Sequence, residues 1–481
     1  MFQLSGKTVC TAREIQRPRS ALEVLDRLRT DPYPWLLDSA LPSELGRFSF
    51  AGADPYLVVR RLGGATEVEC RRAVRPGATP GRFRAAGDPL EIARQLLPAP
   101  PEQSALVDVP FVGGAVGYLA YELADQFDTH HFSGIDDLGL PELYLLFVDR
   151  FIAHDAEKEK LFACGLGFSD DLDVASDRAQ SAVEELCSRI EQGELAARPA
   201  SVRKSAAEPF AFFDASEYAK TINSAKEQIE AGEVYQACLT HRTERDCDAD
   251  PWMLYRTLRR LNPAPFASYF ELPEVAIIGS SPERFLRLDG NRRVESRPIK
   301  GTRPRGCDEA ADLANRSALQ ASPKDRAENL MIVDLVRNDL GRVCEIGSIG
   351  VPELMRIESY ASVHQMVSTI EGRLRSDCDV FDLLRATFPP GSMTGAPKVA
   401  AMRILDGLEP VQRGIYSGAL GYFDVRGGAD LCVVIRTILL RDGRAYLHTG
   451  GGIVADSNPE EEWREGLDKA RLLEAALDKA C

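Results

Sequence analysis

Lys300 and Glu283 are the side chains of this sequence whose types and settings best suit chemistry. Lys300 follows a run that alternates like a strand and precedes Gly301, so a pocket can hold the amine while the backbone turns. An amine attacks only in its neutral form, which burial or neighbouring cations would favour. Glu283 is expected near the end of an adjacent strand, joined through a turn at residues 289–291, and is a candidate general acid. The plainer alternatives are a solvated turn lysine and a salt bridge from Glu283 to Arg284 or Arg287.

Carboxylates near the starts of two predicted helices are candidate metal ligands. One helix starts at Ser322 with a cap and a first-turn proline, and the other starts in the same way at residues 457–459. Near its beginning one helix carries the acids Asp325 and Glu328, and the other carries Glu462 and Glu465, followed by Lys469. Mg²⁺ needs only one or two protein carboxylates. For either helix alone, acids that complement the helix dipole would be explanation enough.

Arg436 interrupts an apolar run, residues 431–440, which is predicted to be a buried strand. A buried guanidinium must be paired, and a ligand carboxylate is a natural bidentate partner. The glycines at 450–452 are predicted to form either a plain bulge or a turn whose backbone N–H groups face an anion.

The elements that must position these residues are a mixture of helices and strands. Residues 1–198 are rich in strands, and within them residues 143–154 and 160–165 are interpreted as a buried hairpin. Residues 199–209 lie in a stretch of Ala, Pro, Ser and charge, and are the predicted linker. Residues 210–481 carry most of the chemically suggestive side chains.

Composition narrows the class of protein. The chain has 481 residues and a net charge of -15, which argues against nucleic acid or an anionic membrane as a partner and favours a small molecule. Eleven scattered cysteines without a C-x-x-C pair suggest neither a zinc site nor a disulfide framework. The sequence has no apolar run of membrane-spanning length and no signal-peptide pattern, so we expect a cytoplasmic protein.

Motifs of the later region resemble those of the chorismate-utilising enzymes typified by anthranilate synthase component I. The similarity covers almost all of residues 210–481, and coincidence does not account for so many long motifs in one order. The motifs are Ser281-Pro282-Glu283-Arg284-Phe285, residues 298–306, Asp325-Arg326-Ala327-Glu328-Asn329, residues 333–339, 390–398 and 418–421, and Gly451-Gly452-Ile453-Val454-Ala455-Asp456-Ser457. The earlier region matches more weakly, at residues 36–39 and 113–121.

The resemblance implies an α+β fold in one intertwined body: two facing antiparallel sheets, helices outside, and a cleft lined by the later region. It implies that Glu328 and Glu465 bind Mg²⁺, with Asp325 and Glu462 close by. The substrate-binding residues that it implies are Arg436, Tyr416, Gly450, Gly451 and Gly452 for a carboxylate, with Thr302, His364, Thr394 and Lys469 lining the site. Gln236 falls where the water-adding members have a Lys base, which disfavours attack by water.

Lys300 separates the branches of this family. Anthranilate synthases have Ala at this position, whereas Lys is typical of the aminodeoxychorismate synthase component I branch, which this chain resembles most. That branch would convert chorismate and ammonia to 4-amino-4-deoxychorismate through a covalent Lys adduct. The chain lacks a convincing Cys–His glutaminase arrangement, so ammonia is expected from a separate glutamine amidotransferase subunit. A separate lyase would then complete 4-aminobenzoate for folate synthesis.

Two alternatives stay open. The first is anthranilate synthase component I, and the second is a non-catalytic regulatory homologue. Inhibited members of the family hold tryptophan near a Leu-Leu-Glu-Ser motif, and here the corresponding candidate pocket carries Leu37, Asp38 and Ser39, with Asp in place of Glu. A tryptophan pocket is therefore a hypothesis whose regulatory role is doubtful.

Overall fold

The computed structural model of the chain describes residues 4–17, 20–41, 43, 45–106, 108–127, 131–193, 210–360 and 363–480. In this part of the chain two large sheets form the body, and the only pair of neighbouring strands that is parallel is β1 (Lys7–Ile15) with β7 (Gln103–Ser104). The other strands of the first sheet are β2 (Trp35–Asp38), β3 (Phe48–Gly52), β10 (Arg150–Asp155), β11 (Lys160–Ser169), β12 (Phe210–Ala211), β13 (Gln236–Asp246), β14 (Phe266–Glu271), β15 (Ala276–Ser281), β21 (Gly395–Ala396), β24 (Thr437–Arg441) and β25 (Arg444–Ile453). They run in the order β12-β13-β25-β24-β15-β14-β2-β3-β10-β11-β1-β7, with β21 beside β13.

The second sheet completes the sandwich. Its strands are β4 (Leu57–Leu62), β5 (Ala65–Cys70), β6 (Gly81–Ala85), β8 (Gly114–Leu119), β9 (Leu143–Val148), β16 (Arg284–Leu288), β17 (Arg293–Ser296), β18 (Ile299–Pro304), β19 (Gly350–Ser359), β20 (Val363–Arg373), β22 (Ala419–Asp424) and β23 (Ala429–Val433). They run in the order β18-β20-β17-β16-β23-β22-β8-β9-β4-β5-β6, with β19 beside β20.

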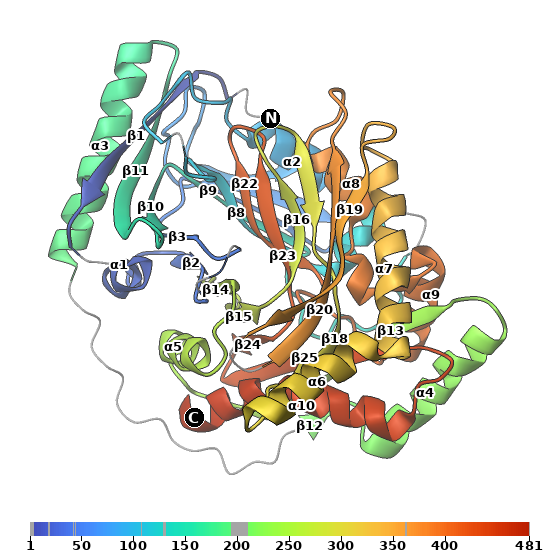
Figure 1. The fold of residues 1–481 in the computed structure, drawn as a ribbon. Helices are drawn as coiled ribbons and strands as arrows, with labels where there is room; N and C mark the ends of the chain where they lie inside the picture. Colours follow the sequence, from blue (N-terminus) through green and yellow to red (C-terminus); the bar gives the residue numbers. More distant parts are fainter. Residues whose placement is uncertain are drawn as a thin grey trace.

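Helices cover the outside of both sheets (Figure 1). They are α1 (Ala21–Leu28), α2 (Pro89–Leu96), α3 (Leu172–Gln192), α4 (Ala215–Glu230), α5 (Pro251–Leu261), α6 (Glu309–Ala321), α7 (Pro323–Gly341), α8 (Val380–Thr387), α9 (Lys398–Leu408) and α10 (Pro459–Ala480), with short 3₁₀ helices η1 (Tyr121–Gln126) and η2 (Gly391–Met393). Helices α1, α3, α5 and α10 bury their apolar stripes in one cluster against the first sheet. None of the helices in the described ranges is long and apolar enough to cross a bilayer.

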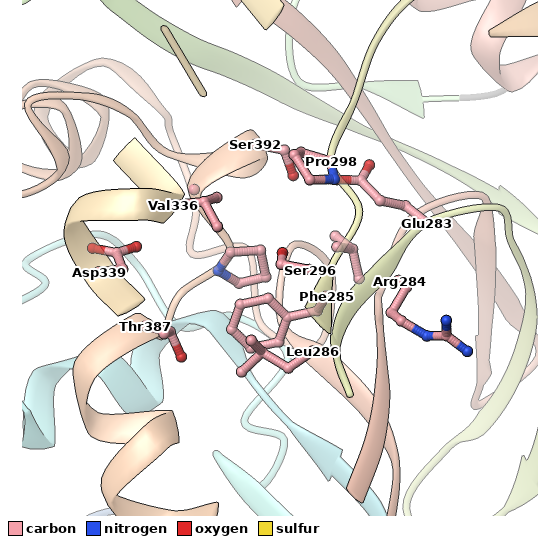
Figure 2. A pocket seen from close by; sticks show the side chains of 13 residues that line it. Glu283, Arg284, Phe285, Leu286, Ser296, Pro298, Val336, Asp339, Thr387 and Ser392 are labelled. Carbon is pink, nitrogen blue, oxygen red and sulfur yellow. The ribbon is translucent and has the colours of Figure 1, made fainter. Parts of the chain in front are cut away.

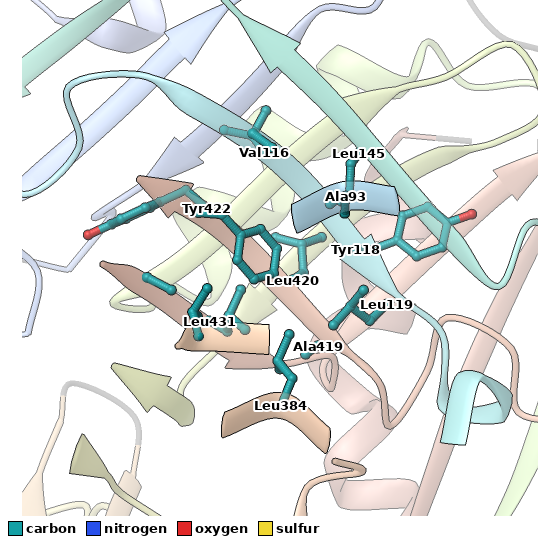
Figure 3. Packing of buried hydrophobic residues seen from close by; sticks show 14 of the residues in the cluster. Ala93, Val116, Tyr118, Leu119, Leu145, Leu384, Ala419, Leu420, Tyr422 and Leu431 are labelled. Atoms are coloured by element: carbon teal, nitrogen blue, oxygen red, sulfur yellow. The ribbon is translucent and has the colours of Figure 1, made fainter. Parts of the chain in front are cut away.

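The inner faces of the two sheets meet in an apolar core. Phe50 and Phe151 of the first sheet contact Phe111, and Phe50 also packs on Tyr422 of the second sheet with ring centroids 5.7 Å apart. On the other side of the second sheet, α2 and α8 cover strands β8 and β22, where Ala93 and Leu384 pack among buried leucines (Figure 3). This arrangement confirms the α+β fold with two facing sheets that the sequence predicts.

Local sequence explains where the two acidic helices begin. Ser322 caps α7 by accepting a hydrogen bond on Oγ from the Asp325 amide at 3.3 Å, and Pro323 occupies the first turn, where no backbone donor is needed. Asn458 caps α10 in the same way, by accepting on Oδ1 from the Glu460 amide at 3.0 Å. Both helix starts therefore lie where the sequence predicts them.

Two apolar runs that were predicted as continuous elements cross from one sheet to the other. Residues 143–154 form β9 in the second sheet and β10 in the first, so the hairpin is only β10 with β11 and the larger prediction is wrong. The run 431–440 is likewise divided into β23 and β24, with Arg436 in the left-handed region at φ 53° between them. Strands that are buried on both faces are apolar throughout, so periodicity cannot show such a crossing.

The earlier and later regions share both sheets. Strand β2 pairs with β14, and β8 pairs with β22, each across the predicted boundary. The predicted linker at 199–209 lies outside the described residues, so its limits stay predictions.

Candidate active site

A cleft of about 410 Å³ lies where the chain crosses between the two sheets. Its walls come from the β15–β16 connection, β18, α7, the end of β25 and the first turns of α10. The predicted site residues that line it are Glu283, Lys300, Thr302, Asp325, Glu328, Tyr416, Arg436, Gly450, Gly451, Gly452, Glu462, Glu465 and Lys469.

The chain passes from one sheet to the other at residues 280–283 and again at residues 433–436. These two segments lie side by side in this cleft. The Glu283 carbonyl accepts a hydrogen bond from the Val433 amide at 3.0 Å, and the Arg436 carbonyl accepts one from the Ser280 amide at 3.0 Å. These backbone hydrogen bonds hold the two segments together, so Glu283 and Arg436 line one cleft although they are far apart in the sequence.

Glu283 has the surroundings of a general acid. Its side chain is buried, and burial raises the pKa of the carboxyl to about 7, against the opposing effects of the Ser392 side chain and the Lys300 charge. Figure 2 shows Glu283 and Ser392 at one end of a second cavity of about 10 Å³, with the Arg284 side chain pointing away. Arg284 pairs instead with Asp430 at 2.9 Å and with Glu295 at 2.6 Å. Among the described residues, Glu283 forms no salt bridge with Arg284 or with Arg287, so the plainer alternative for this carboxyl is wrong.

Lys300 lies in the cleft wall with its amine turned inward. Nζ donates a hydrogen bond to the Ser392 carbonyl at 3.0 Å, and among the described residues no carboxylate forms an ion pair with it. The backbone turns at Gly301, whose φ is +89° and where a Cβ would lie 2.9 Å from Leu319 Cδ1. Only glycine suits that position, and the turn directs the amine toward the cleft that Glu283 also lines.

Arg436 supplies a cation without a carboxylate partner among the residues described. Nη1 donates to the Lys469 carbonyl at 2.5 Å, and burial lowers the pKa of the guanidinium from its usual value. The residue also holds a left-handed backbone conformation, which costs energy in a non-glycine residue and is typical of functional sites. Beside it, the Tyr416 ring stacks on His448 with centroids 4.4 Å apart and an interplanar angle of 6°. This arrangement suits an anionic group of a ligand.

The carboxylates of α7 and α10 face one another across the end of β25. Burial raises the pKa of Glu328 to about 7, whereas the Lys469 charge lowers the pKa of Glu465 to about 2. Lys469 Nζ lies 2.6 Å from Glu465, and Asp325 is already paired with Arg303 at 2.8 Å. Asp325 is therefore the least available of the predicted acids for binding a metal ion.

The glycines of β25 bring the backbone close to these carboxylates. A Cβ at Gly451 would lie 3.1 Å from Glu462 Oε2 and 3.8 Å from Glu465 Oε1, whereas a Cβ at Gly452 would lie 2.0 Å from Gln236 Nε2 and 3.3 Å from Glu328 Oε2. The part of the chain that the structure describes has no group of three or more His, Cys, Asp or Glu side chains arranged as a metal cage. A pair of carboxylates with open positions fits Mg²⁺, which keeps several waters and substrate oxygens as ligands.

Three predicted residues do not line the cleft. His364 points to the other face of β20, where Nε2 lies 3.1 Å from Asp312 and Nδ1 lies 2.7 Å from Ser359 Oγ. Thr394 is fully buried, and Gln236 supports Glu328 from behind by donating from Nε2 to Glu328 Oε2 at 3.3 Å.

Several cleft residues are absent from the sequence prediction: Lys324, Gln365, Ser392, His448 and Arg471. Gln365 lies directly opposite Thr302 across β18 and β20, so strand alternation could have selected it in place of His364. Ser392 lies in the motif at 390–398, but the sequence singles out neither Ser392 nor His448 as a site residue, because both reach the cleft through contacts between distant segments.

The residues of the candidate tryptophan pocket are engaged inside the protein. Asp38 accepts hydrogen bonds from the Tyr255 hydroxyl at 2.7 Å and from Arg259 Nε at 2.5 Å. Ser39 Oγ donates to the Phe48 carbonyl at 2.6 Å. The hypothesis of tryptophan binding there stays a prediction.

The fold and this site define a class of protein. Residues 60–475 match the family model described as chorismate binding enzyme, and the chain belongs to that family. It is 39% identical to aminodeoxychorismate synthase from Streptomyces griseus over 94% of this chain, and it spans 62% of the length of that relative. It is 35% identical to anthranilate synthase component 1 from Acetivibrio thermocellus, with 93% of this chain and 90% of that relative covered.

A solved structure agrees with this assignment. The crystal structure of anthranilate synthase component I from Streptococcus pneumoniae TIGR4 superposes with a TM-score of 0.73 and 27% identity, over 90% of this chain and 93% of that chain.

Proposed function

We propose that this chain acts as an aminodeoxychorismate synthase component I, which converts chorismate and ammonia to 4-amino-4-deoxychorismate. The observation that carries the proposal is that the Lys300 amine and the buried Glu283 carboxyl line the same cleft as the Arg436 guanidinium, with which no carboxylate of the described residues pairs. The similarity to the Streptomyces griseus relative supports this activity. We also propose that ammonia comes from a partner glutamine amidotransferase, and that a separate lyase releases 4-aminobenzoate for folate synthesis.

The first half of the reaction would belong to Lys300 and Glu283. The neutral amine forms a bond to C2 of chorismate, the two ring double bonds shift, and the C4–O bond breaks. Glu283 gives its proton to the departing hydroxyl, which leaves as water, and the new secondary ammonium keeps its protons, so that the lysine can later leave as a neutral amine.

The second half would exchange one amine for another. Ammonia forms a bond to C4, the double bonds shift back, and the bond between C2 and Lys300 breaks. The Glu283 carboxylate takes up the proton that the attacking nitrogen releases, which restores the acid. Because the lysine occupies C2 first, ammonia is directed to C4.

Binding and orientation would fall to the remaining groups. Arg436 and the backbone N–H groups of 450–452 would hold a carboxylate of chorismate, which fixes the ring against Lys300. Mg²⁺ held by Glu328 and Glu465 would act as a Lewis acid on the ring carboxylate and draw off charge that develops in the ring.

The adduct is the direct test. Mass spectrometry of the protein incubated with chorismate and Mg²⁺, without ammonia, should show an adduct on Lys300, and Lys300→Ala should show none. An unmodified Lys300 under conditions that support turnover would count against covalent catalysis.

Anthranilate synthesis is the second candidate, because the Acetivibrio thermocellus relative is 35% identical. The two products differ in the carbon that carries nitrogen. Product identification from chorismate, ammonium and Mg²⁺ separates them, since anthranilate is fluorescent and 4-amino-4-deoxychorismate gives 4-aminobenzoate once the lyase is added. Anthranilate as the main product would reject the proposal.

A further inference from the structure

Lys324 lies among the carboxylates of the proposed metal site. It is in the first turn of α7, its side chain is 38% exposed, and it lines the cleft. Nζ lies 2.7 Å from Glu462 Oε1 and 4.0 Å from Glu328 Oε1. The ammonium group therefore bridges the acids of α7 and α10.

The stability of α7 does not explain this lysine. A cation in the first turn of a helix opposes the helix dipole, and a Lys four residues before a Glu is the weaker order for such a pair. The Glu462 carboxylate also accepts a hydrogen bond from Ser457 Oγ at 2.7 Å, so it would remain partnered without the lysine.

The charge of the cluster is nearly balanced by the protein itself. Lys324 and Lys469 offset two of the three carboxylates that face Gly451 and Gly452. A divalent cation meets much less attraction here than three free carboxylates would give, and it is repelled by an ammonium group a few ångströms away.

We propose that Lys324 controls metal entry to this site: it neutralises the carboxylates before a divalent cation binds, and its side chain must withdraw when the cation reaches Glu328 and Glu465. The proposal rests on the proposed function only in taking those two residues as the metal ligands. The 38% exposure of the side chain leaves it free to turn toward solvent.

Direct metal titration tests the proposal without turnover. Mn²⁺ binding is followed by electron paramagnetic resonance, in the absence of chorismate, for the wild-type chain, Lys324→Met and Lys324→Gln. Both neutral variants should bind Mn²⁺ about tenfold more tightly, because a full positive charge near the ligand oxygens is removed. Lys324→Arg keeps the charge and should bind like the wild type.

Matched controls test whether a gain in affinity comes from the Lys324 charge acting near Glu328. Lys160→Met removes one charge from a surface pair with Glu14, 2.9 Å apart and outside the cleft lining, and should leave the affinity unchanged. In a Glu328→Gln background the gain from Lys324→Met should disappear. Unchanged or weaker binding by the neutral variants, an equal gain in Lys324→Arg, or a gain that persists in Glu328→Gln would overturn the proposal. Product identification with the wild-type chain decides the proposed function separately.

Discussion

Single residues set the conditions under which the proposed reaction can run. Glu283 must be protonated to release the hydroxyl, and burial places the pKa of this carboxyl near neutral pH instead of in the acid range. Lys300 must be neutral to attack, and it shares the cleft with the buried acid. Adduct formation requires both conditions in the same molecule.

We therefore expect a pH dependence that belongs to Glu283. Its pKa of about 7 means that the acid form is lost as pH rises through 7, so the rate advantage of the wild-type chain over Glu283→Gln in adduct formation without ammonia should shrink above that pH. Glu283→Gln should lower the rate of adduct formation by ~10²–10⁴-fold and remove the dependence on this group. Mass spectrometry of adduct formation at a series of pH values gives both the rate and its pH dependence. A Glu283→Gln protein with the wild-type pH profile would contradict the role of Glu283 as general acid.

Arg436 should govern affinity for chorismate. Arg436→Met removes the charge that lacks a carboxylate partner among the described residues, and Arg436→Lys keeps the charge but loses the planar pair of donors. The loss of a buried charged hydrogen-bond partner costs about 2–5 kcal/mol, so the KM for chorismate should rise ~30-fold or more in Arg436→Met, with a smaller rise in Arg436→Lys. A rise below about threefold in both variants would assign the carboxylate to another group.

At the scale of elements, two neighbouring glycines at the end of β25 have different surroundings and different roles. Gly450 packs against the backbone of β13, where a Cβ would lie 2.2 Å from the Leu239 carbonyl oxygen. Gly451 faces the ends of flexible side chains on α10 instead. The strand therefore combines close packing at one residue with open space for a ligand at the next.

Alanine at these two positions should have different effects. Gly450→Ala forces β25 away from β13 and should destabilise the fold by ~1–3 kcal/mol, which is visible as a lower Tm. Gly451→Ala should keep the Tm and weaken Mn²⁺ binding, because its Cβ enters the space beside Glu462 and Glu465. Thermal unfolding and metal titration of both variants check this, and equal losses of stability would show that the glycines are only structural.

At the scale of the whole molecule, neither region has a sheet of its own. Strand β14 needs β2, and β22 needs β8, so each region supplies neighbours to strands of the other. Removal of one region would leave open sheet edges and an uncovered apolar core.

A fragment of residues 210–481 should consequently fail to fold alone. We expect no cooperative thermal transition by circular dichroism, and recovery of the transition when a fragment of residues 1–193 is added. The full chain provides the reference curve. Cooperative unfolding of the isolated 210–481 fragment would show that the shared sheets are dispensable.

The sequence by itself determined the candidate side chains for the chemistry, the caps that begin α7 and α10, and the family, because caps and motifs are local features of the chain. Only the tertiary structure decided where apolar runs cross between the sheets, and these crossings bring Glu283 and Arg436 into the wall of one cleft. It also decided that Gln365, not His364, faces the cleft, and that Lys324 bridges Glu462 and Glu328. Periodicity reports which face of an element is buried, but not which distant segment covers that face.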